Sequence, residues 1–384
     1  MLSGRDQIAR HEQRVAAASI HATDAGFAGA THANGADLAQ CAAFAAIARI
    51  RSHHNPGKTY TMPIFSIRSL PGAALTLVLA ATLAPAAVHA AGPQPKNVPG
   101  YYRMMLGDFE VTAISDGTVA LPVDKILTNV KPGQVDKALA KQFLKAPVET
   151  SVNGYLINTG TKLVLIDSGA AGLFGPTLGK LAANLKAAGY SAEQVDEVYI
   201  THLHPDHVGG LMVDGKMAFP NAVIRADKHD SDYWLSEDNM KKAPKDVQGF
   251  FQGAMASLTP YVKADKFKSF EGNTDLAPGI KAIASHGHTP GHAIYAIESK
   301  GQKLVLWGDL MHVAAVQFPN PSVTIAFDVD SKAAAAQRKK AYADAAKGGY
   351  IVGSAHLSFP GLGRLRAEGS GYAFVPVNYS PPAK

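Results

Sequence analysis

The segment ITHLHPDHVGG, residues 200–210, concentrates side chains that can bind a metal ion. It contains His202, His204, Asp206 and His207, directly after an apolar run. His202 and His204 are two residues apart, so at the end of a strand both imidazoles would point to the same side. Imidazole and carboxylate groups are the ligands expected for zinc or a similar divalent metal. The alternative is a surface loop that is merely rich in histidine.

Further candidate ligands occur later in the chain, each where a predicted strand meets a loop. They are His288 in SHGHTPGH, Asp309 in LWGDL and His356 in GSAHLS. Functional residues often gather at such strand-to-loop junctions. Together the seven groups supply the eight contacts that two four-coordinate ions need, provided that one carboxylate bridges. The sequence therefore favours a two-metal site over the surface loop.

Short apolar runs that alternate with helical segments are expected to position these residues. The predicted strands cover residues 109–115, 152–160, 162–167, 197–201, 280–285, 293–299, 303–309 and 350–356. Helices are predicted along Leu178, Leu181 and Leu185, over 228–262 and over 331–347, with a capping box at Ser191 and Gln194.

Two segments repeat one pattern, GYLINTGTKLVLID and AIYAIESKGQKLVLWGD. Each predicts a strand, a turn and a second strand that ends in aspartate. Two strand-rich halves with helices outside them predict two packed sheets in one α/β sandwich. Coincidence between short apolar strings is the alternative explanation of the repeat.

The composition describes a globular protein of 384 residues, with 47% apolar residues and a formal net charge of +6. Lysine and arginine form no run of the kind that binds nucleic acid, so we expect no nucleic-acid partner. Residues 62–90 have a positive start, an apolar stretch and a small-residue cleavage site, which is typical of a secretory signal peptide. The apolar stretch is shorter than the roughly 20 residues that a spanning helix needs, so no membrane anchor is expected.

The predicted organisation has three parts. Residues 1–61 are expected to be an upstream extension, with translation starting at Met62, and residues 91–384 form the functional domain. The protein is therefore predicted to be periplasmic or secreted. Its single cysteine, Cys41, lies in the extension, so the mature chain would need no disulfide.

The motif His202-x-His204-x-Asp206-His207, with Gly-His288-Thr-Pro-Gly, Asp309 and His356 after it, resembles the metallo-β-lactamase superfamily from about residue 101 to residue 379. The resemblance implies a four-layer αββα sandwich. It also implies how the ligands are shared. One metal would be held by His202, His204 and His288, the other by Asp206, His207 and His356, with Asp309 bridging them.

Four further polar residues are expected to lie outside the set of metal ligands. His292, in the same turn as His288, is expected to support the site without binding metal. Asp167 is expected to be a buried carboxylate that hydrogen-bonds the histidine turn. His229 and His286 belong to no motif, so both are expected to be ordinary surface residues.

Two divalent ions a few ångströms apart can hold a bridging hydroxide at neutral pH. That chemistry predicts a hydrolase for esters, lactones, amides or phosphotriesters, with Asp309 as a catalytic residue. Two ions per chain are expected, with zinc as the leading metal, and manganese, iron and cobalt tolerate the same ligands.

Residues 100–125, 169–190, 249–258 and 357–380 are similar to methyl parathion hydrolase and to the dihydrocoumarin hydrolases. The acyl-homoserine lactonases share the ligand pattern, but these segments resemble the other branch. By this resemblance Phe174, Trp234 and Phe250 would form an aromatic entrance, which suits an aryl leaving group. Ordinary core packing is the alternative for each. The resemblance also implies a homodimer.

The sequence departs from methyl parathion hydrolase around the expected pocket. His312 and Phe327 stand where that family has leucine, and Ile325 stands where it has threonine. An arginine is missing near Ile126, and the loop around 246–248 is one residue shorter. Phe327 should crowd a phosphorus with two alkoxy groups more than it would a flat lactone. His312 could orient a carbonyl or protonate a leaving oxygen, or it could only support the metal site.

The leading prediction is a secreted hydrolase of aryl esters or lactones with weak phosphotriesterase activity. An organophosphate hydrolase is the second prediction. A periplasmic metal-binding protein without turnover is the third, although uptake proteins usually enclose a single ion.

Overall fold

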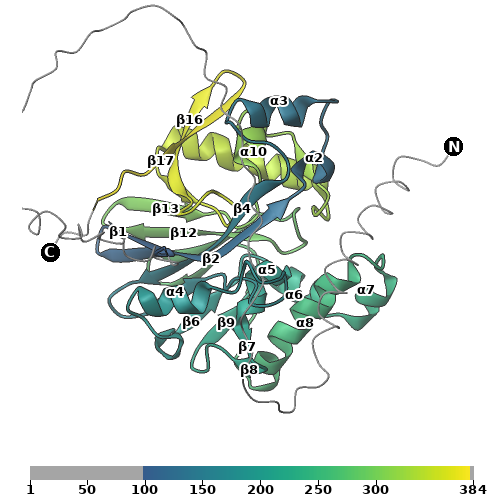
Figure 1. Ribbon diagram of the computed structural model, residues 1–384. Coiled ribbons are helices and arrows are strands. Elements are labelled where there is room, and N and C mark those ends of the chain that lie inside the picture. Colours follow the sequence, from purple (N-terminus) through teal and green to yellow (C-terminus); the bar gives the residue numbers. More distant parts are fainter. Residues whose placement is uncertain (1–97, 381–384) are drawn as a thin grey trace, which may run out of the picture. The chain divides into compact units, whose positions relative to one another are not determined.

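The computed structural model describes residues 98–380 of the chain (Figure 1). The predicted extension at 1–61 and the predicted signal peptide at 62–90 lie outside the described residues, so both stay predictions. Within 98–380, none of the helices has the length and apolar character needed to cross a membrane.

Two large sheets form the centre of the fold, with strand orders β1-β2-β4-β5-β6-β9 and β10-β11-β12-β13-β15-β16-β17. The strands of the first sheet are β1 (Tyr101–Leu106), β2 (Phe109–Leu121), β4 (Val148–Asn158), β5 (Leu163–Ile166), β6 (Glu197–Tyr199) and β9 (Val223–Arg225). Those of the second sheet are β10 (Thr274–Ala277), β11 (Ile280–Ala284), β12 (Ala293–Ser299), β13 (Gln302–Leu306), β15 (Ile351–Gly353), β16 (Leu362–Glu368) and β17 (Gly371–Pro376).

The sequence repeat corresponds to a structural repeat. In the first sheet, β4 pairs with β5 antiparallel and β5 pairs with β6 parallel. In the second sheet, β12 pairs with β13 antiparallel and β13 pairs with β15 parallel. The two similar segments therefore occupy equivalent places in the two sheets.

Alternation along the strands explains why the sheets stack. Val164 and Ile166 of β5 belong to the core between the sheets, together with Leu304 and Leu306 of β13. The residue between each pair faces helices instead, so Leu165 packs in the outer core of the first sheet. Because successive strand residues face opposite sides, each sheet buries both of its faces. The predicted four-layer αββα sandwich is confirmed.

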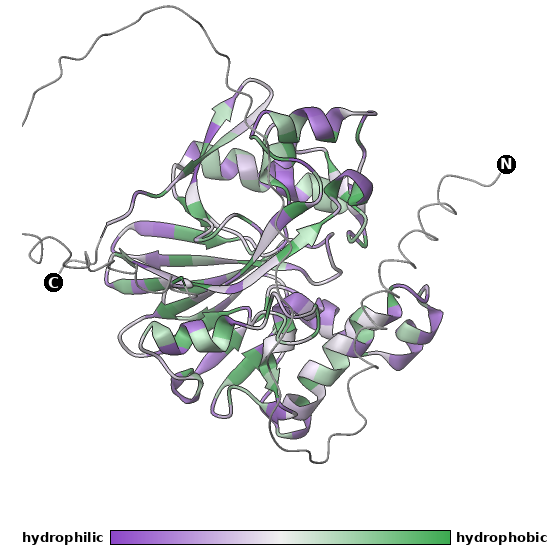
Figure 2. Ribbon diagram, viewed as in Figure 1, coloured by the Kyte–Doolittle hydropathy of each residue, from purple (hydrophilic) through white to green (hydrophobic). Residues whose placement is uncertain are grey.

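Helices cover the outer faces of the two sheets (Figure 1). Those associated with the first sheet are α4 (Leu181–Ala187), α6 (Lys228–Trp234), α7 (Glu237–Lys242) and α8 (Gln248–Lys263), and the second sheet packs against α10 (Ser331–Gly348). The remaining elements are α2 (Val123–Ile126), β3 (Leu127–Thr128), α3 (Gln134–Ala140), η1 (Ala192–Gln194), α5 (Pro205–Val208), η2 (Gly209–Leu211), β7 (Met212–Val213), β8 (Lys216–Met217), α9 (Ala314–Gln317) and β14 (Thr324–Ile325). In Figure 2 the short helix α7 is mostly hydrophilic, whereas hydrophobic residues run along the central strands.

The segment predicted to be helical, 228–262, is helical and divides into α6, α7 and α8. Ser236 caps α7 by accepting a hydrogen bond from the backbone N–H of Asn239. Ala243 is extended because it precedes Pro244, and a residue before proline disfavours the helical region. Leu178 also lies outside its predicted helix, since Gly179 has a φ of +81°. The predicted capping box of Ser191 and Gln194 is present.

Candidate metal centre

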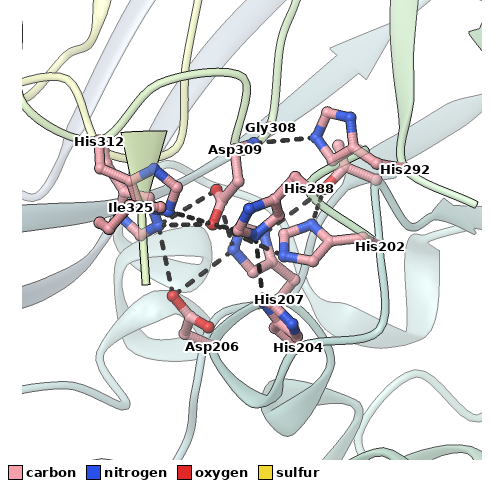
Figure 3. Close-up of polar contacts among 12 residues, drawn as sticks. His202, His204, Asp206, His207, His288, His292, Gly308, Asp309, His312 and Ile325 are labelled. Atoms are coloured by element: carbon pink, nitrogen blue, oxygen red, sulfur yellow. Dashed lines mark hydrogen bonds and ion pairs between the residues drawn. The ribbon is translucent and has the colours of Figure 1, made fainter. Parts of the chain in front are cut away.

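The predicted ligands converge where strands of both sheets end (Figure 3). His202 follows β6, Asp309 follows β13, His356 follows β15, and His288 lies in the turn between β11 and β12. Two groups of ligand atoms result, and in each group all atoms lie within 4.8 Å of one another. The first group is His202, His204, His288 and Asp309, and the second is Asp206, His207, Asp309 and His356. They match the two groups that the family resemblance implies.

The turn after β6 divides its four side chains between the two groups. His204 is extended, and Pro205 occupies the first position of helix α5. Proline is favoured there because its fixed φ suits a helix start. The chain therefore changes direction between His204 and Asp206, so that His202 and His204 join one group and Asp206 and His207 join the other.

Asp309 belongs to both groups, and its carboxylate lies between their imidazoles. Its Oδ2 lies 3.6 Å from His202 Nε2 and 3.4 Å from His288 Nε2. Its Oδ1 lies 3.2 Å from His207 Nε2 and 3.1 Å from His356 Nε2, and His356 Nε2 is also 3.1 Å from Oδ2. Asp206 completes the second group, with Oδ2 at 3.4 Å from His356 Nε2. The Asp309 carboxylate is thus placed to bridge two cations.

These spacings fit divalent cations. Ligand bonds of about 2.0–2.1 Å arranged as a tetrahedron put neighbouring ligand atoms roughly 3.3 Å apart. Three atoms at the centre, His202 Nε2, His207 Nε2 and Asp309 Oδ1, are buried and have no hydrogen-bond partner within the described part of the chain. Buried polar atoms are normally satisfied, so these three are placed to meet a ligand.

Other groups hold the outer ring nitrogens of His207 and His356. His207 Nδ1 lies 2.9 Å from Asp167 Oδ2, and His356 Nδ1 lies 2.9 Å from the carbonyl oxygen of Ser151. A partner at the outer nitrogen fixes the ring and directs the other nitrogen at the metal. Asp167 also accepts hydrogen bonds from the backbone N–H and hydroxyl of Thr201, so it holds the histidine turn as predicted.

His292 lies outside both groups. Its Nε2 accepts a hydrogen bond of 3.1 Å from the backbone N–H of Asp309, and its Nδ1 lies 3.2 Å from the carbonyl oxygen of Ser285. Burial, with the charge of His288, lowers the pKa of His292 to about 3. A neutral ring suits this double contact. Backbone groups therefore engage both ring nitrogens, and the supporting role expected from the sequence stays a prediction.

The centre combines negative carboxylates with imidazoles. Burial would raise the pKa of Asp206, but the charges of His207 and His356 keep it below its ordinary value. Burial would lower the pKa of His288, but hydrogen bonds and charges from Asp309 and Asp328 raise it to about 9. Buried charges of one sign thus face groups of the other sign across the centre.

Three carboxylates that sequence reasoning missed hold the surrounding loops. Asp328 Oδ1 lies 2.9 Å from His288 Nδ1. Asp230 accepts hydrogen bonds from the backbone N–H groups of Leu203 and Gly291, one in each histidine loop. Asp116 accepts three from the loop at 170–181. None of these three carboxylates belongs to a recognisable sequence motif. Only a helix N-cap pattern could have directed attention to the segment around Asp230.

The predicted aromatic residues have different environments. Phe250 is half-buried, and its ring centroid lies 4.9 Å from that of His204 and 6.4 Å from that of Phe327. Phe174 is exposed. Trp234 packs against His204 from the hydrophobic core with 1% of its surface exposed, so it supports that ring and does not line an entrance.

Ile325 and His312 complete the predicted pocket. Ile325 is fully buried in a side cluster with Val313 and Val323, which makes it a packing residue. His312 is buried next to the Asp309 carboxylate, with its Nε2 3.1 Å from Asp309 Oδ2. Its ring stacks on His356 with centroids 5.0 Å apart.

The chain is similar to known proteins in sequence and in fold. The family model described as the metallo-beta-lactamase superfamily matches residues 147–348. The crystal structure of hydrolase AbOPH, of the beta-lactamase superfamily, is 38% identical with a TM-score of 0.71, covering 74% of this chain and 100% of that one. The structure of AidC, a dizinc quorum-quenching lactonase in complex with a product, is 27% identical with a TM-score of 0.68, covering 73% and 99%.

A curated relative is an N-acyl homoserine lactonase from Bacillus sp.. It is 27% identical to this chain over 173 residues, which is 40% of this chain and 60% of the relative. The chain thus spans about 60% of the length of that relative.

Proposed function

The chain belongs to the metallo-beta-lactamase superfamily, and from this premise we propose that it is a binuclear metal-dependent hydrolase of lactones and aryl esters. The observation that carries the proposal is the shared carboxylate. The Asp309 carboxylate lies within 3.6 Å of imidazole nitrogens of both ligand groups, an arrangement suited to a pair of ions and not to a single enclosed one.

In this proposal the first cation is held by His202, His204 and His288, the second by Asp206, His207 and His356, and Asp309 joins them. A pair of divalent cations bound there would activate water as a nucleophile and polarise an oxygen of the substrate. Asp206 is the most accessible of the ligands, with 19% of its side chain exposed, whereas the side chain of His207 is 1% exposed. We therefore place the approach of the substrate on the Asp206 side.

Two observations support a lactone or aryl ester as the substrate. AidC and the Bacillus relative are both named as lactonases. In addition, Phe250 lies beside His204, and Phe327 lies beside Phe250 and His312, so their aromatic surface can pack against a flat ring or an acyl chain.

An organophosphate hydrolase is the second candidate, supported by the resemblance of residues 100–125 and 357–380 to methyl parathion hydrolase. The positions of Phe327 and His312 disfavour it. The two rings lie 6.2 Å apart, and His312 contacts the bridging carboxylate, so a tetrahedral phosphorus with two alkoxy groups would meet both.

The test compares four substrates on one zinc-loaded sample of the full chain: dihydrocoumarin, an N-acyl homoserine lactone, p-nitrophenyl acetate and methyl parathion. We expect kcat/KM for dihydrocoumarin or the homoserine lactone to exceed that for methyl parathion by at least about tenfold, which is about 1.4 kcal/mol in transition-state binding. A preference for methyl parathion would reverse the order of the two candidates. Absence of chelator-sensitive turnover on all four would exclude a hydrolase.

The variant His312→Leu distinguishes the two roles left open for His312. If the imidazole contacts the substrate, the variant keeps two ions per chain while kcat/KM for the lactone falls. If it only supports the ligands, the affinity for zinc falls, and the ratio of kcat/KM for the lactone to kcat/KM for the phosphotriester stays constant.

A further inference from the structure

A third group of metal-capable side chains lies apart from the two groups around Asp309. It consists of Asp227, His229 and His286, and its ligand atoms all lie within 4.8 Å of one another. Asp227 is the N-cap of α6, His229 lies in the first turn of that helix, and His286 lies in the turn between β11 and β12. The two histidines were expected to be unrelated surface residues, but the fold brings them together.

The spacing within this group suits one cation. Asp227 Oδ1 lies 2.8 Å from His229 Nδ1, and Asp227 Oδ2 lies 3.6 Å from His286 Nε2. The centroids of the two imidazole rings are 5.0 Å apart. Neighbouring ligands of a tetrahedral zinc ion lie roughly 3.3 Å apart, so small side-chain rotations would bring all three groups into contact with one ion.

The carboxylate is held in place by backbone groups. Asp227 Oδ1 accepts a hydrogen bond of 2.8 Å from the backbone N–H of His229, and Oδ2 accepts one of 3.0 Å from that of Gly272. A carboxylate has about four lone-pair positions, so two remain for other partners. The side chain of Asp227 is buried and cannot turn away toward solvent.

One ring nitrogen points into the group without a partner. His286 Nε2 is buried and has no hydrogen bond within residues 98–380. The group is nevertheless open to ions from solution, because 49% of the His229 side chain and 34% of the His286 side chain are exposed. An ordered carboxylate, an unpartnered imidazole nitrogen and an exposed second imidazole together form a three-ligand site with one open side.

We propose that Asp227, His229 and His286 bind a third divalent ion of the zinc type, with water at the open position. Two neutral imidazoles and one carboxylate are a common zinc ligand set. The ion would join the start of α6 to the turn that carries His288. Its role is structural, because Asp230 of the same helix holds the backbone of Leu203 and Gly291.

The experiment measures zinc per chain. The full chain is stripped with a chelator, equilibrated with Zn²⁺, freed of unbound ion and analysed by mass spectrometry of the metal. The variants are His229→Gln and His286→Gln, each of which removes one imidazole from a partly exposed position. The matched control is Asp232→Asn, an exposed carboxylate of α6 that pairs with Lys228.

We expect the wild type to bind three ions per chain, each histidine variant to bind one ion fewer, and Asp232→Asn to match the wild type. The wild type and each variant share every other histidine, so a difference of one bound ion reports on this group alone. Equal zinc content in the wild type and in a folded histidine variant would show that the three residues only contact one another and bind no ion.

Discussion

At the scale of single residues, the candidate centre depends on groups that orient its imidazoles. Asp328 is a clear case, since its Oδ1 contacts His288 Nδ1 and its Oδ2 accepts a hydrogen bond of 3.1 Å from the backbone N–H of Ile325. The guanidinium of Arg338 lies 4.0 Å from the same carboxylate, and both side chains are buried. Asp328 therefore fixes both the tautomer and the direction of the His288 ring.

Replacement of Asp328 by Asn should weaken zinc binding at the first group. The amide keeps the shape but loses the charge that favours the proton on His288 Nδ1, so we expect affinity to fall by about 10–100-fold. Competition with a chromogenic chelator measures it. Asp330→Asn is the control, because Asp330 caps α10 and asparagine caps equally well. An affinity for Asp328→Asn within twofold of the wild type would contradict the orienting role.

At the scale of elements, equivalent strands of the two sheets deliver the same pair of side-chain types, an aspartate and a histidine, to the candidate centre. β5 and β6 are parallel neighbours followed by Asp167 and His202, and β13 and β15 are parallel neighbours followed by Asp309 and His356. The carboxyl ends of parallel strands meet at one edge of a sheet, where ligands commonly bind. The repeated strand pattern therefore places side chains from both sheets at the same centre.

The turn at 207–210 also requires a close approach between backbones. The backbone N–H of Ser168 donates a hydrogen bond of 2.8 Å to the carbonyl oxygen of His207, and the backbone N–H of Gly210 donates one of 2.9 Å to Gly169. A Cβ atom on Gly210 would lie 1.8 Å from the carbonyl oxygen of Ser168. Only glycine allows this packing.

Gly210→Ala should therefore destabilise the fold by about 1–3 kcal/mol, as overpacking of a buried contact does. Gly249→Ala is the matched control. It lies in α8 with no atom within 4 Å of an added Cβ, so alanine should stabilise the helix by about 0.5–1 kcal/mol. Denaturant unfolding of both variants gives the two free energies, and equal stabilities would refute the backbone contact.

At the scale of the whole described fold, the candidate ligands come from both sheets. His202 and His207 follow a strand of the first sheet, whereas Asp309 and His356 follow strands of the second. The sheets otherwise meet through the apolar core that contains Tyr155, Tyr199 and Tyr295. Bound cations would therefore add polar cross-links at one edge of this apolar interface.

Removal of the metal should lower the melting temperature. A ligand at 100 times its dissociation constant stabilises the folded state by about 2.7 kcal/mol, which corresponds to about 5–10 °C for a domain of this size. Calorimetry with and without a chelator measures the shift. Asp309→Asn should show a much smaller shift because the shared ligand is weakened. Identical melting temperatures for the stripped and loaded wild type would contradict cross-linking of the sheets.

Much of the centre could be predicted from the chain alone because its ligands stand in local patterns. His202, His204, Asp206 and His207 are close in sequence, and Asp309 and His356 each follow an apolar strand. The repeated strand–turn–strand segments also predicted two packed sheets, because two strand-rich halves with helices outside them bury their apolar faces against each other. The order and identity of side chains carry this information without any long-range contact.

The tertiary structure alone decided which distant residues support those ligands. Asp328 reaches His288 across 40 positions, and Asp227 meets His286 across 59, with no shared motif. Trp234 and Phe250 look alike in sequence, yet one packs in the core and the other lies beside His204 at an intermediate depth. Such contacts depend on how helices and loops pack on the sheets. That packing sums many weak interactions over the whole fold, and no short segment encodes it.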